Sequence, residues 1–126
     1  MTCDETIHAT AVSLTLSNQP WLAVAVDQPG VAVLLRGVSG SGKSDLALRL
    51  MAGHGASLIA DDRVALTTQS QQVICHAPAA IAGLLEVRGL GLLRVAPAPP
   101  TALALVIDLV ARGEVERLPA PDSIAL

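Results

Sequence analysis

Residues 37–44 constrain the fold of this chain more than any other stretch, because they fit the pattern G-x-x-x-x-G-K-[ST] of a phosphate-binding P-loop. The eight residues are Gly37, Val38, Ser39, Gly40, Ser41, Gly42, Lys43 and Ser44. Glycines allow successive backbone N–H groups to point into one concavity and to approach an anion closely. Lys43 would place a positive charge on the β- and γ-phosphates of a nucleotide, and the Ser44 hydroxyl would bind Mg²⁺.

The flanking sequence has the order strand, loop and helix that a P-loop requires. An apolar run at residues 31–35 predicts a short buried strand before the loop. Residues 45–51 carry apolar side chains at i, i+4 spacing, which predicts a helix with one apolar stripe, and Gly53 is a natural end for it. The alternative, a Gly/Ser-rich turn with an exposed lysine, is disfavoured by this context.

The remaining patterns predict strands on both sides of the loop. Alternating apolar and polar residues in 8–16 indicate a strand with one solvent-facing side, and residues 21–26 indicate a second strand. Together with the strand before the loop they suggest an antiparallel meander that leads into the nucleotide site. Residues 63–68 and 72–75 predict a hairpin, and residues 103–110 the longest strand.

The length of 126 residues indicates one domain, and 52% apolar residues are enough for a core. Phe and Tyr are absent and Trp21 is the one aromatic residue, so the core must be built from Val, Leu, Ile and Ala.

Asp61 and Asp62 follow directly after an apolar run at residues 57–60. A strand that ends in a carboxylate shortly after a P-loop helix is the Walker B arrangement, in which the carboxylate holds Mg²⁺ or orients the nucleophile. One alternative is an ordinary solvated turn. Another is a Walker B aspartate at Asp108, but there the apolar run continues beyond the carboxylate, which indicates an acidic residue on the exposed side of a strand. We favour Asp61 and Asp62.

Glu86 and Arg88 place opposite charges within the apolar stretch 84–94. Two glycines, Gly89 and Gly91, follow and would permit tight backbone near a ligand. A charged pair in such a stretch lies either on a solvated strand face or in a site, and the residues alone leave both possibilities open.

Charge and hydropathy argue against several classes of partner. The formal net charge of -3, without a long basic run, argues against nucleic acid or an anionic membrane as the main partner. No segment reaches the roughly 18 apolar residues of a membrane span, and Asp4 and Glu5 stand where a signal peptide would be basic. We expect a cytoplasmic protein in which Cys3 and Cys75, far apart in the sequence, are reduced thiols.

Three segments together resemble the catalytic domain of HPr kinase/phosphorylase: residues 37–44, 58–62 and 85–91. The third segment, which reads LEVRGLG, is the specific one, because P-loops occur in many families. The opening around His8 and the segment 116–119 are also similar to that family. The resemblance runs from His8 to about residue 121 and is to the short form found in alphaproteobacteria.

The resemblance implies phosphorylation of a serine on HPr, a phosphocarrier of the sugar phosphotransferase system, with ATP and Mg²⁺. It also implies removal of that phosphate by phosphorolysis. By position, Lys43 and the loop would hold the nucleotide phosphates, and Ser44 and Glu86 would bind Mg²⁺. The Asp61–Asp62 pair would supply the general base, with Asp62 in the better position. His8 and Arg117 match further active-site positions of the family.

The family fold implies an α/β P-loop core akin to phosphoenolpyruvate carboxykinase, with a mixed sheet, N-terminal antiparallel strands and a P-loop helix. We expect residues 1–126 to form a single P-loop kinase domain without the N-terminal regulatory domain and the C-terminal helices of longer relatives. The family also implies a homo-oligomer, namely a hexamer.

Two other functions stay open from the sequence. One is an ATP-binding sensor module with impaired catalysis, which a short C-terminal part would favour. The other is a P-loop kinase or ATPase that acts on a small molecule.

Overall fold

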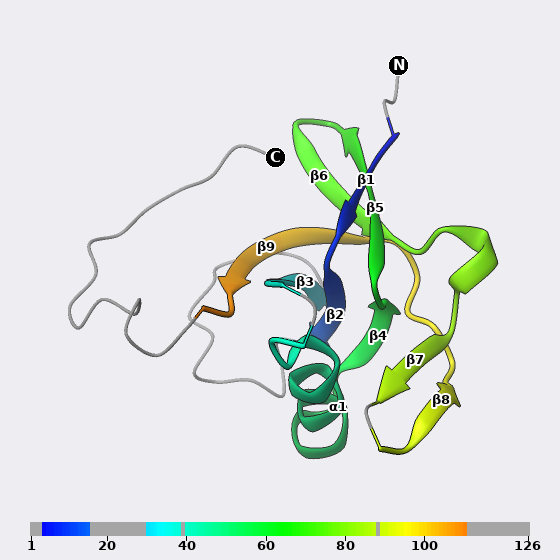
Figure 1. The fold of residues 1–126 in the computed structure, drawn as a ribbon. Helices are drawn as coiled ribbons and strands as arrows, with labels where there is room; N and C mark the ends of the chain where they lie inside the picture. The colour runs from blue at the N-terminus through cyan, green and yellow to red at the C-terminus, as the bar shows by residue number, and fades with distance from the viewer. Residues whose placement is uncertain (1–3, 16–29, 39, 88, 111–126) are drawn as a thin grey trace.

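The computed structural model describes residues 4–15, 30–38, 40–87 and 89–110 (Figure 1). Nine strands, one α-helix and one 3₁₀ turn lie in this part of the chain. In chain order they are β1 (Asp4–His8), β2 (Thr10–Thr15), β3 (Gly30–Arg36), α1 (Lys43–His54), β4 (Ser57–Ala60), β5 (Arg63–Gln69), β6 (Gln72–His76), η2 (Ala79–Ile81), β7 (Leu84–Val87), β8 (Gly91–Arg94) and β9 (Thr101–Asp108).

Seven strands form one mixed sheet in the order β1-β5-β6-β9-β3-β2-β4, and β7 pairs with β8 in a separate antiparallel hairpin. β3 and β9 run parallel, and the other described pairs run antiparallel. Only Ala9 separates β1 from β2, and only Asp61 and Asp62 separate β4 from β5. The edge strands are β1, which pairs with β5, and β4, which pairs with β2. Each continues almost directly into a strand at the other side of the sheet, β1 into β2 and β4 into β5, and the sheet curls accordingly (Figure 1). The predicted α/β class with a mixed sheet is confirmed.

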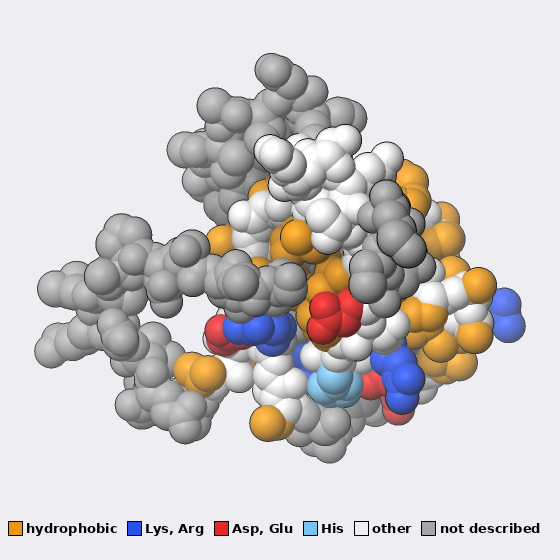
Figure 2. All heavy atoms as spheres, turned by 90° about the horizontal axis from the view of Figure 1, so that it is seen from above, with side chains coloured by type: hydrophobic (Ala, Val, Ile, Leu, Met, Phe, Trp, Pro, Cys, Tyr) orange, Lys and Arg blue, Asp and Glu red, His pale blue; other side chains and the backbone are white. Residues whose placement is uncertain are grey.

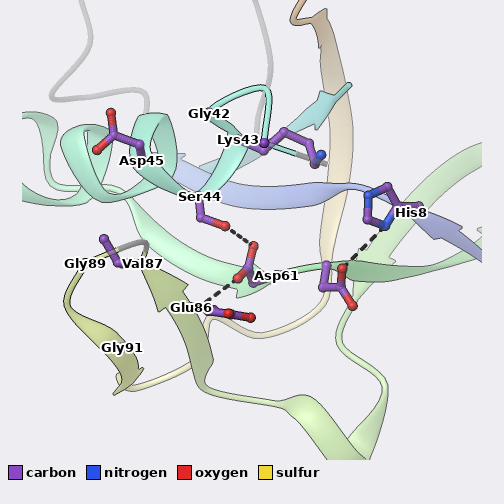
Figure 3. Close-up of a pocket in the computed structure, with 12 residues that line it drawn as sticks. His8, Gly42, Lys43, Ser44, Asp45, Asp61, Glu86, Val87, Gly89 and Gly91 are labelled. Carbon is purple, nitrogen blue, oxygen red and sulfur yellow. Dashed lines mark hydrogen bonds and ion pairs between the residues drawn. The ribbon is translucent and has the colours of Figure 1, made fainter. Parts of the chain in front are cut away.

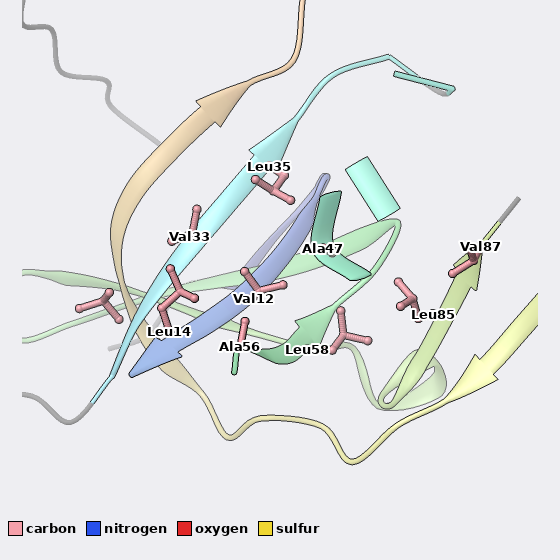
Figure 4. Close-up of a cluster of buried hydrophobic side chains, with 10 residues drawn as sticks. Val12, Leu14, Val33, Leu35, Ala47, Ala56, Leu58, Leu85 and Val87 are labelled. Carbon is pink, nitrogen blue, oxygen red and sulfur yellow. The ribbon is translucent and has the colours of Figure 1, made fainter. Parts of the chain in front are cut away.

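Buried apolar residues form two clusters, one on each face of the strands at the centre of the sheet. The first cluster lies between the sheet, α1 and β7 (Figure 4). Its members are Val12, Leu14, Val31, Val33, Leu35, Ala47, Ala56, Leu58, Leu85 and Val87. The second cluster lies against the opposite face and consists of Ala9, Ala11, Ala32, Leu34, Ile59, Ala60, Val64, Leu66 and Cys75. Successive residues of a strand point to opposite faces, so β2 and β3 contribute to both clusters.

The strand predicted at residues 8–16 differs from the structure in two ways. It is divided into β1, which begins at Asp4, and β2. The expected solvent-facing side is wrong for β2, because Ala11 and Val12 point to opposite faces and both are fully buried. The reason is the curl of the sheet, which places the second cluster over the face that was expected to be wet.

Helix α1 continues past the predicted end at Gly53 and finishes at His54. Gly55 follows in the left-handed conformation, with φ of 69°, and its backbone N–H donates to the carbonyl oxygen of Leu50. A glycine adopts this conformation at little cost and thereby satisfies a free carbonyl at the helix end. The second glycine of the Gly-His-Gly stretch, rather than the first, therefore ends the helix.

The hairpin predicted after the aspartate pair is confirmed as β5–β6, with Ser70 and Gln71 at positive φ in its turn. The predicted long strand is confirmed as β9. Five predicted features lie outside the described residues: Cys3, the strand at 21–26, Ser39, Arg88 and the segment that contains Arg117. Within the described ranges, no helix has the length and apolarity that crossing a membrane requires.

Candidate active site

One cleft of about 530 Å³ lies where the loop after β3, the turn between β4 and β5, and the β7–β8 hairpin meet (Figure 3). Its lining is polar and glycine-rich, and comes from segments far apart in the sequence. The lining residues are His8, Gly40, Gly42, Lys43, Ser44, Asp45, Asp61, Asp62, Glu86, Val87, Gly89 and Gly91. Most of the residues predicted for the site, including the lysine, both aspartates and Glu86, therefore lie in one cleft.

Lys43 is the first residue of α1, and its side chain turns back onto the loop. Its Nζ donates to the carbonyl oxygens of Gly37 at 2.7 Å and Val38 at 3.0 Å, and the residue is only 7% exposed. The ammonium is thus held at the loop by backbone acceptors. A buried cation at this position would attract an anion in the adjoining cleft.

Glycines are required at two kinds of position in the loop. Gly40 and Gly42 have φ of 83° and 99°, a region that other residues rarely adopt. Gly37 is required for space, because a Cβ atom there would lie 2.5 Å from the Ser41 hydroxyl oxygen and 3.0 Å from the Leu109 carbonyl oxygen. The loop therefore packs closely against its own serine and against the residue after β9.

Asp61 accepts hydrogen bonds from three different elements and is only 6% exposed. Its Oδ1 accepts from the hydroxyls of Thr10 in β2 at 2.8 Å and Ser44 in α1 at 2.7 Å. Its Oδ2 accepts from the backbone N–H of Glu86 in β7 at 3.0 Å. Figure 3 shows this carboxylate between Ser44 and Glu86. Such a network fixes the direction of the carboxylate, since each donor constrains one lone pair.

Asp62 has a different environment from its neighbour. Its side chain is 70% exposed, and its Oδ1 lies 3.4 Å from Nδ1 of His8. Its backbone has φ of 71°, which is uncommon for a residue other than glycine, and its carbonyl oxygen accepts from Ala9 N–H at 3.2 Å. One aspartate is thus enclosed and the other is open to the cleft, so the pair can divide two roles.

Glu86 reaches the cleft from the β7–β8 hairpin, on the opposite side from the loop (Figure 3). Gly89 and Gly91, with φ of 88° and 98°, form the tip of this hairpin and also line the cleft. The sequence left open whether Glu86 belongs to a solvated face or to a site. The structure places it in the cleft, with its backbone N–H bonded to Asp61.

The oxygen donors of Ser44 and Glu86 suit a hard divalent cation such as Mg²⁺, which binds proteins through one or two carboxylates together with substrate phosphates. Among the described residues, no group of three or more His, Cys, Asp or Glu residues that could hold a metal occurs.

Asp108, the alternative Walker B candidate, does not line this cleft. It pairs with Arg36 through two hydrogen bonds, from Nε to Oδ1 at 2.7 Å and from Nη2 to Oδ2 at 3.0 Å. The bonded guanidinium lowers the pKa of Asp108, and the carboxylate raises the pKa of Arg36. On the face shown in Figure 2, charged side chains of both signs lie close together.

Asp45 and Val87 line the cleft but were not predicted from the sequence. Thr10 was not predicted either, and it contacts a site residue without lining the cleft itself. It is fully buried and bonds Asp61 across 51 positions of sequence. The one available signal is its place two residues after His8, which in an extended chain puts both side chains on the same face.

Comparisons with known proteins identify the family of this chain. The profile of the family described as HPr Serine kinase C-terminal domain matches residues 15–119. The chain belongs to this family. The resemblance predicted from the sequence is therefore confirmed, and His8 and Thr10 lie just before the matched range.

The chain is similar to curated HPr kinase/phosphorylases of several bacteria. It is 43% identical to the protein of Bordetella pertussis in an alignment of 111 residues, and the match covers 79% of this chain and 35% of the relative. It is 48% identical to that of Levilactobacillus brevis over 73 residues, which are 57% of this chain and 23% of the relative. The chain thus spans about a third, or less, of the length of these relatives.

The fold is similar to a solved structure, the Hpr(Ser) kinase/phosphatase from Coxiella burnetii. The TM-score is 0.70 at 26% sequence identity, and the match covers 93% of this chain and 66% of that one. The curled mixed sheet is therefore the arrangement found in an HPr kinase.

Proposed function

We propose that the chain transfers the γ-phosphoryl group of ATP to a serine hydroxyl of an HPr-like phosphocarrier protein. The observation that carries the proposal is the single cleft that joins Lys43 and Ser44 of the loop to Asp61, Asp62 and Glu86. Phosphoryl transfer requires positioning and charge stabilisation more than covalent chemistry from the protein. The names of the relatives, HPr kinase/phosphorylase, support this class of substrate.

The loop and Lys43 would bind the nucleotide phosphates through backbone N–H groups and one ammonium. Ser44 and Glu86 would hold Mg²⁺, with Asp61 bonded to the Ser44 hydroxyl. When bound, the ion would neutralise negative charge on the phosphate oxygens.

Asp62 is the better candidate for the general base, because it is open to the cleft and Asp61 is enclosed by three donors. The serine oxygen would attack the γ-phosphorus while the bond to the β–γ bridging oxygen breaks and ADP leaves. The serine proton would pass to the Asp62 carboxylate. His8 lies beside Asp62 and would orient it, and Arg117 would add positive charge to the transferred group.

The reverse reaction, phosphorolysis of phosphoserine with Asp62 as the acid, belongs to the same proposal. The likeness of the core to phosphoenolpyruvate carboxykinase, a hexameric assembly and a cytoplasmic location stay predictions. An ATP-binding sensor without catalysis and a kinase of small molecules are the alternatives.

The test is transfer of labelled γ-phosphate from ATP to HPr in the presence of Mg²⁺, with the labelled residue identified by mass spectrometry. We expect phosphoserine with the unchanged protein and a loss of about 10²–10⁴-fold in rate with Asp62→Asn, which removes the base. Glu5→Gln, an exposed site on β1 outside the cleft, is the matched control.

Normal transfer by Asp62→Asn would remove the general-base assignment. Nucleotide binding without any transfer to HPr would favour the sensor alternative, and turnover of ATP without a protein product would favour the small-molecule alternative.

A further inference from the structure

Residues 8–10 form a continuous contact with the aspartate pair. His8 lies 3.4 Å from Asp62, Ala9 N–H donates to the Asp62 carbonyl oxygen at 3.2 Å, and the Thr10 hydroxyl donates to Asp61 Oδ1 at 2.8 Å. The chain between β1 and β2 thus follows the turn between β4 and β5. This contact results from the crossing of two nearly continuous strands at the curl of the sheet.

Asp61 accepts hydrogen bonds from Thr10, Ser44 and the Glu86 N–H, and Thr10 is the one of these three residues that cannot touch a ligand. It is 0% exposed and does not line the cleft, whereas Ser44 and Glu86 both do. Its hydroxyl has an acceptor in Asp61, and its neighbours Ala9 and Ala11 are fully buried. A buried hydroxyl is retained at little cost only where it is hydrogen-bonded. Any influence of Thr10 on chemistry in the cleft must therefore pass through Asp61.

Thr10 and Ser44 donate to the same oxygen, Asp61 Oδ1. Because the Thr10 bond is shielded from the cleft, it can persist whatever Ser44 binds. With Thr10 in place, the Asp61 carboxylate keeps the orientation in which Oδ1 accepts a hydrogen bond from the Ser44 hydroxyl and Oδ2 accepts one from the Glu86 N–H. The oxygen lone pairs of Ser44 then face away from Asp61.

We propose that Thr10 is a positioning residue, which fixes Asp61 so that Ser44 and Glu86 present their oxygens to Mg²⁺ of a bound nucleotide. This inference rests on the proposed function. Partners behind metal ligands commonly change metal affinity by about 10–100-fold when they are removed.

The experiment compares binding of a fluorescent ATP analogue, with Mg²⁺ and with EDTA, by the unchanged protein, Thr10→Val and Thr10→Ser. Valine keeps the shape of threonine without the hydroxyl, and serine keeps the hydroxyl. We expect Thr10→Val to raise the Kd for the analogue in the presence of Mg²⁺ by about tenfold or more and to leave the Kd in EDTA unchanged. Thr10→Ser, which keeps the hydroxyl, should bind the analogue with Mg²⁺ as the unchanged protein does.

Val12→Ala is the matched control for a purely structural effect. It lies on the same strand, belongs to the first core cluster and has an apolar side chain that cannot donate a hydrogen bond to Asp61. If Val12→Ala, at a comparable loss of thermal stability, raises the Mg²⁺-dependent Kd as much as Thr10→Val does, the positioning role is overturned. Equal Kd values for Thr10→Val and the unchanged protein overturn it as well and leave the proposed function standing. Absence of nucleotide binding in the unchanged protein overturns both.

Discussion

The ammonium of Lys43 lies at the start of α1 and is hydrogen-bonded to two loop carbonyls, in contact with the cleft that Ser44 and Asp61 share. At the scale of single residues, we propose that this charge is the main group that would hold the phosphates of a nucleotide. Hydrogen bonds to charged groups contribute about 1.5–3 kcal/mol, and 1.4 kcal/mol corresponds to a factor of ten in affinity.

We therefore predict that Lys43→Met weakens ATP binding by at least about tenfold, because methionine keeps an unbranched stem and lacks the charge. The measurement is titration of a fluorescent ATP analogue. Arg49→Met, on an exposed turn of α1 with a side chain 77% exposed, is the matched control and should bind normally. Unchanged affinity in Lys43→Met would contradict the assignment of the loop.

At the scale of elements, the ends of the parallel strands β3 and β9 support the loop. Arg36 and Asp108 stand opposite each other in the register of this pair, and their side chains form two hydrogen bonds. The backbone N–H of Leu109 donates to the Arg36 carbonyl oxygen at 2.8 Å, and the Leu109 carbonyl lies against Gly37. The ion pair therefore holds the end of β9 next to Gly37, the first residue of the loop.

This pair predicts a pH-dependent contribution to stability. The pKa of Asp108 is lowered from its ordinary value of 3.8 by its bond to Arg36. The contribution is therefore complete above about pH 4 and is lost as the pH falls through the lowered pKa of the folded state. Because both side chains are partly exposed, we expect Asp108→Asn to cost no more than about 1 kcal/mol at pH 7.

Urea unfolding of Asp108→Asn at pH 7 and near pH 3 measures this effect. The difference from the unchanged protein should shrink in acid and at high salt. Asp45→Asn removes the exposed 3.4 Å pair with Arg49 and should cost less at either pH. A cost for Asp108→Asn that is the same at both pH values would contradict the role given to the ion pair.

Cys75 also belongs to this scale, since it is a buried member of β6 in the second cluster. Burial raises the pKa of its thiol to about 12, so the thiol remains protonated and unreactive at neutral pH. This agrees with the reduced state that the sequence predicted for it.

At the scale of the whole molecule, the site depends on the curl of the sheet. β1–β2 and β4–β5 cross where Ala9 and the aspartate pair interrupt them, and the loop and the β7–β8 hairpin meet at the same place (Figures 1 and 3). The three donors to Asp61 lie 51, 17 and 25 positions away in sequence. No single element holds the site.

The sequence predicted the features that depend on neighbouring residues. The strand before the loop, the β5–β6 hairpin and β9 carry local apolar patterns, and all three are present. Lys43 and the aspartate pair could be predicted for the cleft because both belong to motifs of fixed local spacing. Thr10 could not be predicted in the same way, because its role depends on a contact between distant strands that no local pattern records.

The same limit explains the errors. The alternation in residues 8–16 indicated one solvent-exposed side for β2. Ala11 is buried because it packs in the second cluster, whose other members come mostly from strands distant in the sequence. The end of α1 depends on which glycine adopts the left-handed conformation, and two glycines lay within reach.

We propose, above all, that the cleft binds a nucleoside triphosphate at the loop, with its terminal phosphate facing Asp62. A crystal structure with Mg²⁺ and a non-hydrolysable ATP analogue tests it most directly. We expect the phosphates to lie against the backbone N–H groups of residues 40–44 and Lys43, with Ser44 and Glu86 at the metal. A nucleotide bound elsewhere, or a terminal phosphate turned away from Asp62, would contradict it.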